Sequence, residues 1–240
     1  GVLVLLFVAA ALTMKDWGFT PEKHGSVAQS MRAILAGSMR YGLRKPPVRW
    51  MMIASIFTAS VGFYAFYALQ PYLLKLYGDS SAYWVAGLAA ALVAGSQILG
   101  GVLSPKIARL APRRTTTIIG ISAVSCLVLI GIGLTHSFYA ALLLVSLWGM
   151  ANAAVMPVRQ AYMNGMIPSK QRATVLSFDS LVGNIGSSAI QPALGKAADA
   201  YSYGTSFILG GSLQLLALPF LYLSRRQHDS ADTQEKPETK

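Results

Sequence analysis

Long apolar runs dominate this sequence and constrain its fold more than any other feature. The six longest are residues 50–74, 84–103, 116–134, 138–158, 173–194 and 204–223. Each is close to the ~20 residues that an α-helix needs to cross a bilayer. They lack the alternation of apolar and polar residues that is typical of outer-membrane barrel strands. The sequence therefore predicts an all-α integral membrane protein with a bundle of six transmembrane helices.

The composition agrees with a membrane protein and argues against other classes. Only 12% of residues are charged, about half the share found in soluble domains. The net charge of +11 would suggest a nucleic-acid partner in a soluble protein, but here the sidedness of the loops accounts for it, so no nucleic acid is expected. The single cysteine, Cys126, lies in an apolar run and can form no intramolecular disulfide or metal cluster. We expect no cofactor and no metal.

Lysine and arginine residues fall on alternate connections between the six runs. If the loop at 15–49 is cytoplasmic, 18 of these residues lie on the cytoplasmic side and only Lys75 and Lys196 lie on the other. This distribution obeys the positive-inside rule. It predicts a multi-pass protein of the plasma or inner membrane, with its basic loops and C-terminus in the cytoplasm.

The segments that flank the six-helix domain, residues 50–223, are of three kinds. Residues 1–14 are apolar but too short to span a bilayer, so we expect them to be the end of a truncated transmembrane helix and the chain to be a fragment. Residues 15–49 form a basic loop in which apolar residues recur at helical spacing. This loop holds either an amphipathic surface helix or a flexible linker. Residues 224–240 are polar and of mixed charge, which predicts a disordered tail.

A helical hairpin is expected where the runs 138–158 and 173–194 are joined by a polar turn, residues 159–172. Asp179, in its second arm, is the only acidic residue inside the six runs, and Arg159 and Arg172 are expected at the mouth of the hairpin. Asp179 follows Arg172 by seven residues, so it lies about 10 Å deeper along the helix. This depth favours a gating ion pair with Arg159 or another basic residue at the rim. Proton coupling through Asp179 and a static structural pair are the alternatives.

Polar and aromatic residues are concentrated in the first, second, fourth and fifth runs. Helices that line a substrate pathway need such groups, whereas helices that face lipid can be apolar throughout. We therefore expect these four helices to surround a pathway and the third and sixth to support them from outside. The alternative is that single Asn and Gln residues only connect helices. The candidate cavity-lining residues are Thr58, Tyr64, Tyr67, Gln70, Gln97, Trp148, Asn152, Asn184 and Gln191.

Three stretches of the hairpin carry a resemblance to a known family. They are MPVRQAYMNG (156–165), IPSKQRATVLSFDSL (167–181) and GNIGSSAIQPALG (183–195). The middle stretch is similar to the turn between helices ten and eleven of bacterial efflux-type transporters of the major facilitator superfamily. The whole chain resembles the C-terminal half of such a protein, from the end of helix six to helix twelve. The resemblance implies half of a twelve-helix fold, built of two inverted three-helix repeats.

A loop motif of that family is present here in an incomplete form. In the stretch GGVLSPKIARLAPRR (100–114), Gly101, Arg113 and Arg114 match the motif, but Ser104 and Pro105 stand where an aspartate is expected. The departure puts a charge-relay role for this loop in doubt.

The resemblance implies a secondary transporter that works by alternating access, with proton-coupled export of small organic or lipophilic compounds as the favoured activity. Its partners would be a small-molecule substrate, the bilayer and the missing N-terminal six-helix half. A non-transporting receptor or scaffold and an importer of a sugar or another metabolite are the alternatives. The sequence has no H-E-x-x-H or G-x-S-x-G motif, and its three histidines are scattered, so we do not expect an enzyme.

Overall fold

The structure, a computed structural model, describes residues 2–14, 26–79 and 81–234, and the chain divides into two units, Gly1–Leu35 and Ala36–Lys240. The first unit contains α1 (Val2–Thr13) and most of α2 (Val27–Ser38). With 12 residues, α1 is too short to cross a bilayer by itself. The loop expected at 15–49 is helical over α2, and its binding to a membrane surface stays a prediction. Lys15 and Lys23, which the charge count used, lie outside the described residues.

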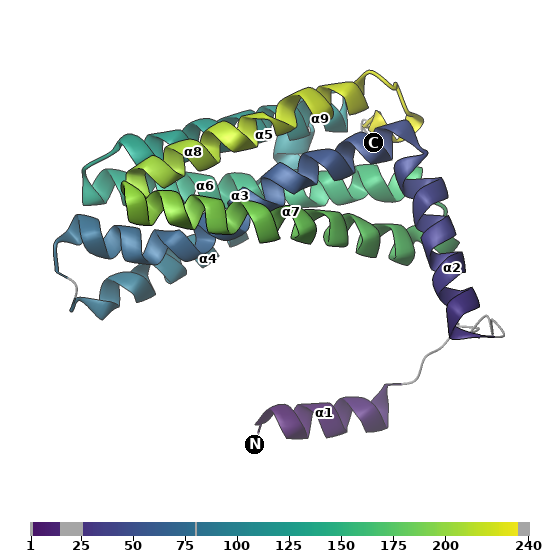
Figure 1. The fold of residues 1–240 in the computed structure, drawn as a ribbon, viewed down its shortest axis with the longest axis horizontal. Coiled ribbons are helices and arrows are strands. Elements are labelled where there is room, and N and C mark those ends of the chain that lie inside the picture. Colours follow the sequence, from purple (N-terminus) through teal and green to yellow (C-terminus); the bar gives the residue numbers. More distant parts are fainter. Residues whose placement is uncertain (1, 15–25, 80, 235–240) are drawn as a thin grey trace, which may run out of the picture. The chain divides into compact units, whose positions relative to one another are not determined.

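Seven α-helices of the second unit lie alongside one another in Figure 1. They are α3 (Pro46–Tyr77), α4 (Tyr83–Ala108), α5 (Arg114–Leu134), α6 (Phe138–Met166), α7 (Arg172–Ala200), α8 (Tyr203–Leu215) and α9 (Ala217–Arg225). A π-helical turn, Met39–Leu43, precedes α3. We call the end of the bundle where α3, α5 and α7 begin and α4, α6 and α9 end the basic end.

The predicted helical membrane fold is confirmed, with α7 as its most polar member. Among the described residues, five segments are long and apolar enough to cross a membrane: α3, α4, α5, α6, and α8 together with α9. The sixth predicted helix, α7, has 29 residues but is too polar to qualify by composition. Asp179, Asn184 and Lys196 are among the residues that lower its hydropathy. Such a helix fits a place between protein elements better than a place in lipid.

The helices are longer than the apolar runs predicted. α6 continues to Met166 although Pro157 lies inside it. The polar turn expected at 159–172 is therefore shorter than predicted, because residues 159–166 belong to α6. One proline removes a single backbone hydrogen bond, and membrane helices tolerate this loss. Arg159 is therefore a residue of α6, and the connection to α7 is reduced to residues 167–171. Pro71 and Pro192 likewise lie inside α3 and α7.

A break separates α8 from α9 at Leu216. Pro219 follows Leu215 by four residues, so it cannot donate the backbone hydrogen bond that would continue the helix across this point. The pair together, Tyr203–Arg225, has the length of one membrane span.

Glycines allow the closest approaches between helices. A Cβ on Gly100 of α4 would lie 2.2 Å from the carbonyl oxygen of Met150 in α6. Gly133 of α5 and Gly204 of α8 face each other in the same way, since a Cβ on Gly133 would lie 2.4 Å from the Gly204 carbonyl. Small residues at such crossings let backbones pack directly, which favours association inside a membrane.

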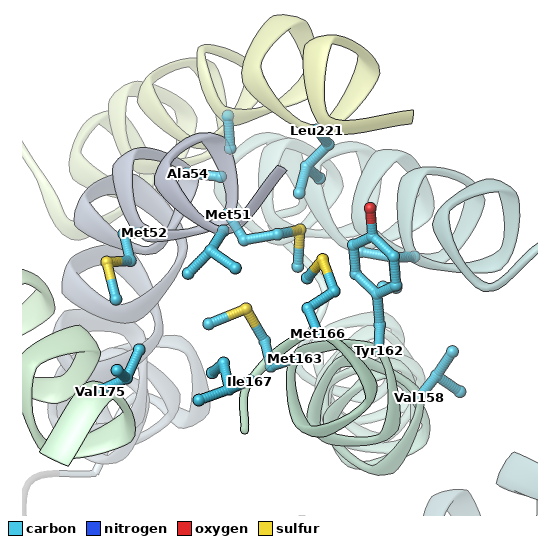
Figure 2. Packing of buried hydrophobic residues seen from close by; sticks show 13 residues of the cluster. Met51, Met52, Ala54, Val158, Tyr162, Met163, Met166, Ile167, Val175 and Leu221 are labelled. Atoms are coloured by element: carbon cyan, nitrogen blue, oxygen red, sulfur yellow. The ribbon is translucent and has the colours of Figure 1, made fainter. Parts of the chain in front are cut away.

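Methionines fill much of the core at the basic end. Met51, Met52, Met163 and Met166 belong to one buried cluster with Tyr162 and Leu221. Figure 2 shows the side chains of Met51, Met163 and Met166 close together, while that of Met52 lies on the other side of α3. Unbranched and polarisable, methionine adapts to irregular or changing cavities better than branched apolar residues do. This end of the bundle therefore has a core that can repack.

The tail predicted as disordered spans 224–240, and its residues 224–234 are described and pack against the bundle, which differs from the prediction. Residues 235–240 lie outside the described residues. We call residues 227–234 the C-terminal strap. Asp232, 3% exposed, accepts hydrogen bonds from the backbone N–H and the hydroxyl of Thr115, at 2.7 and 2.8 Å. Arg113, the N-cap of α5, supplies no side-chain cap, so Asp232 caps that helix from a distant part of the chain. Polar composition alone did not reveal this role.

Lys45 connects the strap to two further elements. Its Nζ donates to the carbonyl oxygen of Met166 at the end of α6, at 2.8 Å. The same Nζ pairs with Oδ2 of Asp229, at 3.4 Å. Two backbone contacts complete the attachment of the strap. They are an isolated antiparallel β-bridge between Arg113 and Thr233 and a hydrogen bond from the N–H of Gln234 to the carbonyl oxygen of Pro112. The strap thus holds together the start of α3, the start of α5 and the end of α6.

We predict that Gly100→Ala lowers the free energy of unfolding by about 1–3 kcal/mol, because the new methyl group meets a backbone carbonyl that cannot turn away. Gly101→Ala is the matched control, since a Cβ there meets nothing within 4 Å. It should be neutral or slightly stabilising. Thermal unfolding of the two variants in detergent measures the difference, and equal midpoints would contradict the crossing described here.

We predict that Asp232→Ala destabilises the protein by roughly 1–3 kcal/mol, since it removes a helix cap and leaves the buried N–H of Thr115 without a partner. Asp232→Asn keeps one acceptor oxygen and should cost less. Ser230→Ala, at an exposed neighbour in the strap, should have almost no effect. Thermal unfolding checks all three, and an unchanged Asp232→Ala midpoint would show that the tail does not support the bundle.

Candidate functional site

A buried ion pair joins the two arms of the hairpin. Nη2 of Arg159 in α6 lies 2.8 Å from Oδ1 of Asp179 in α7. The side chains are 18% and 9% exposed. At this burial the attraction is much stronger than for a surface pair, and either charge alone would be costly.

Both charged residues lie at the same depth below the basic end. Arg159 precedes the end of α6 by seven residues, and Asp179 follows the start of α7 by seven. At 1.5 Å per residue, each is about 10 Å from its helix end. The expectation that Arg159 lies at the mouth of the hairpin was wrong, because α6 extends beyond it.

Groups from α3 complete the site. Nη2 of Arg159 also donates to the carbonyl oxygen of Met51, at 3.5 Å. The hydroxyl of Ser55 lies 3.3 Å from Asp179 Oδ1 and 2.7 Å from the Met52 carbonyl. A hydroxyl has one proton, so Ser55 donates to only one of these acceptors at a time. Among the described residues, Oδ2 of Asp179 accepts no hydrogen bond.

The helices that carry the pair belong to different packing groups. α7 packs mainly against α3 and α8, whereas α6 packs mainly against α4 and α5, and the backbones of α6 and α7 rarely approach each other. The long Arg159 side chain therefore reaches across a boundary between packed groups. A small separation of α6 from α7 would break this contact without disrupting a tight helix interface.

Arg172 does not join the ion pair. It begins α7, and its Nη2 donates to the carbonyl oxygen of Asn164 in the last turn of α6, at 3.2 Å. This contact satisfies a free carbonyl at a helix end. Arg172 therefore stabilises the connection between α6 and α7.

The nine predicted cavity-lining residues differ widely in exposure. Tyr64 and Trp148 are 8% and 3% exposed and lie in the core, so the structure does not place them on an open face. Tyr64 donates to the hydroxyl of Ser206 in α8, at 2.6 Å. The other seven retain exposed surface. Tyr67, Gln97 and Asn184 are exposed, and Thr58, Gln70, Asn152 and Gln191 are half-buried.

The residues of the incomplete loop motif serve local packing. Gly101 is exposed, while Arg114 donates to the backbone carbonyl of Ala231 in the strap. Ser104, which stands in place of the expected aspartate, donates to the carbonyl oxygen of Ala154 in α6, at 2.8 Å. Arg113 contacts His228. These contacts attach the loop to the strap and to α6.

Sequence reasoning missed several polar contacts. Ser55, Ser60 and Ser187 are buried between α3 and α7, and the hydroxyl of Ser187 donates to that of Ser60 at 3.2 Å. Serine is common as a small packing residue in membrane helices, so the sequence did not show that these hydroxyls contact one another. Among the described residues, no group of three or more His, Cys, Asp or Glu side chains could hold a metal ion.

Comparisons with known proteins give a family and two structural relatives. The sequence model of the Major Facilitator Superfamily matches residues 108–240. A bacterial homologue of the human lysosomal transporter Spinster, in an inward-facing and unoccupied conformation, has a TM-score of 0.64 and 18% identity, over 97% of this chain and 58% of that chain. The POT family transporter PepTSo has a TM-score of 0.62 and 16% identity, over 81% of this chain and 39% of that one.

These structural likenesses show a shared fold, and the chain spans less than two thirds of either relative. No curated protein sequence matches the chain.

We predict that Arg159→Gln and Asp179→Asn each lower the free energy of unfolding by about 3–5 kcal/mol, because each leaves a buried charge without its partner. The double variant should be less destabilised than the sum of the two, since no lone charge remains. Ser55→Ala should cost no more than about 1.5 kcal/mol. Unfolding of the four variants in detergent tests this, and simple additivity would show that the pair has no coupling.

Proposed function

This chain belongs to the Major Facilitator Superfamily, and from that membership we propose that it is the second six-helix half of a secondary transporter. In this proposal the Arg159–Asp179 pair is a gate on the cytoplasmic side, closed in one state and open in the other. The favoured activity is export of small organic or lipophilic compounds in exchange for protons.

The observation that carries the proposal is the position of the ion pair. It is buried, it joins α6 to α7, and these helices otherwise have few close backbone contacts. A static structural pair is expected inside a well-packed interface, whereas a gate needs a contact that a small helix movement can break. The position across two packing groups favours the gate.

The methionine cluster supports such a movement. Met51 provides the backbone carbonyl that Arg159 contacts, and its side chain belongs to the same core as Met163 and Met166. When α6 and α7 separate, side chains of this kind can fill the changed space with little strain. The gate and its adaptable surroundings therefore lie at one end of the bundle.

Asp179 also has the chemistry for proton coupling. Its Oδ2 has no hydrogen-bond partner among the described residues, while Oδ1 receives the Arg159 contact. When the gate opens and the guanidinium departs, the carboxylate in the membrane interior needs another partner, and this proposal assigns that place to a proton. Gate opening and protonation would then be one event.

An exposed face of α3 and α7 suits a complementary six-helix half. Phe63 and Tyr67 of α3 are 48% and 69% exposed, and Leu181 and Ile185 of α7 are 51% and 62% exposed. Polar Asn184 is exposed on the same helix as these aliphatic residues. We propose that a first half of the same protein covers this face and that the substrate passes between the halves.

We predict that Asp179→Asn, in a protein that contains both halves, lowers proton-coupled transport by on the order of tenfold or more, since losing the pair shifts the balance between states by over about 1.4 kcal/mol. Inverted vesicles with an imposed proton gradient are exposed to a panel of lipophilic compounds, and dissipation of the gradient is recorded. Asp199→Asn, which removes an exposed charge from the same helix, is the matched control.

Two results would overturn parts of the proposal. If Asp179→Asn retains wild-type transport with the same pH dependence, both the gating and the coupling roles fail. If no compound dissipates the gradient through the wild-type protein, proton-coupled export fails. A sodium- or substrate-gradient assay then separates an importer from a non-transporting receptor.

A further inference from the structure

A basic cavity lies at the basic end of the bundle, and its lining contains neither Arg159 nor Asp179. Its volume is about 410 Å³, and it is lined by Arg113, Tyr222, Arg225, Arg226 and His228. The walls come from the residue that precedes α5, the last turn of α9 and the start of the strap. Three of the five lining side chains are guanidinium groups, and none is acidic.

The charges of this cavity are not neutralised by the described part of the chain. The side chains of Arg225 and Arg226 have no hydrogen bond or ion pair there. Arg113 Nη1 lies 3.2 Å from Nδ1 of His228. Arginine can only donate, so Nδ1 of His228 is the acceptor in this contact. The cavity thus has an excess of hydrogen-bond donors.

The two carboxylates of the strap have other partners. Asp229 pairs with Lys45 and accepts from the backbone N–H of Ala231. Asp232 is buried and caps α5 through Thr115. Neither is a wall of the cavity.

Helix electrostatics explain part of this arrangement but not all of it. Arg225 and Arg226 lie at the C-terminal end of α9, where positive charge is favourable. Arg113 is the N-cap of α5, where positive charge opposes the helix dipole. The carboxylate of Asp232 already caps α5, so the groups that remain for a bound anion are the guanidinium groups of the cavity.

The position of the cavity along the membrane normal indicates which kind of anion it binds. The last spanning segment ends at Arg225 and α5 begins at Arg114, so the cavity lies at the ends of two membrane spans. Tyr222, 53% exposed, is an aromatic side chain of the kind that occupies the headgroup region. Farther from this end, Leu127 of α5 and Leu216, between α8 and α9, are 65% and 49% exposed and suit contact with acyl chains.

The strap fixes the shape of the cavity. His228 has a positive φ of 51°, which is uncommon for a residue with a side chain. Backbone hydrogen bonds hold this turn, and the Arg113–Thr233 bridge returns the strap to the start of α5. His228 and Arg113 are therefore held as two walls of one site.

We propose that this cavity binds the phosphate group of an anionic phospholipid. Basic pockets at the ends of membrane helices bind lipid phosphates through charge-assisted hydrogen bonds. Arginine is suited to this because its planar group can bind two oxygens at once. The site is independent of the proposed transport function and requires only that the bundle lies in a membrane.

The test is native mass spectrometry of the full chain in neutral detergent, titrated with phosphatidylglycerol or phosphatidylcholine. We expect Arg225→Gln/Arg226→Gln to weaken phosphatidylglycerol binding by at least about tenfold, which is about 1.4 kcal/mol of binding free energy. Lys106→Gln/Arg109→Gln is the matched control, since both residues are exposed at the end of α4 and the charge change is equal. Its effect should be less than about threefold. Arg225→Lys/Arg226→Lys, which keeps the charge, should retain intermediate binding.

Each other outcome overturns the proposal in a defined way. Equal loss in the two glutamine pairs would mean diffuse attraction to a basic surface and no built site. Equal binding of phosphatidylcholine would remove the requirement for an anionic lipid. Competition by inorganic phosphate at the concentration of the lipid would assign the site to free phosphate. Thermal unfolding without lipid verifies that the variants are folded.

Discussion

The absence of water in a bilayer interior is the constraint on which the rest of this structure depends. Every backbone N–H and C=O group there needs a partner within the protein, and helices meet this need inside each segment. The hydroxyls follow the same rule, as Ser146 and Ser180 donate to carbonyls one turn earlier. Side-chain packing then decides how the helices associate, and glycines such as Gly100 and Gly133 bring backbones into direct contact.

The Arg159–Asp179 pair places two charges in an interior that is otherwise mostly apolar. Two charges in a membrane interior persist only when they meet, and here they meet across helices that otherwise pack on different neighbours. A charge buried without a partner is costly, which stabilises the closed pair. For the same reason, the pair can separate only if Asp179 finds a new partner. A proton or a rearranged basic group can be that partner, which connects the geometry to the proposed transport cycle.

The basic end is where separate parts of the chain are joined. Lys45 holds the end of α6 and the strap, Asp232 caps α5, and the hydroxyl of Tyr162 in α6 lies 3.2 Å from that of Ser224 in α9. The ion pair lies about 10 Å below this end, and the methionine core lies around the same helices. A firm outer attachment with an adaptable core beneath it allows local rearrangement while the helices stay connected.

The sequence by itself determined the class of fold, because hydrophobic runs of spanning length have one stable solution in a membrane. It also selected Asp179, since a lone carboxylate in an apolar run is conspicuous. It could not place Arg159 correctly, because a proline does not reveal whether a membrane helix ends or continues. Trp148 and Tyr64 were expected on an open face because polarity does not say which side of a helix is covered. Only the tertiary structure decided that Asp232, in a polar tail with no periodic pattern, caps a helix more than a hundred residues away, since such a contact depends on where the chain returns in space.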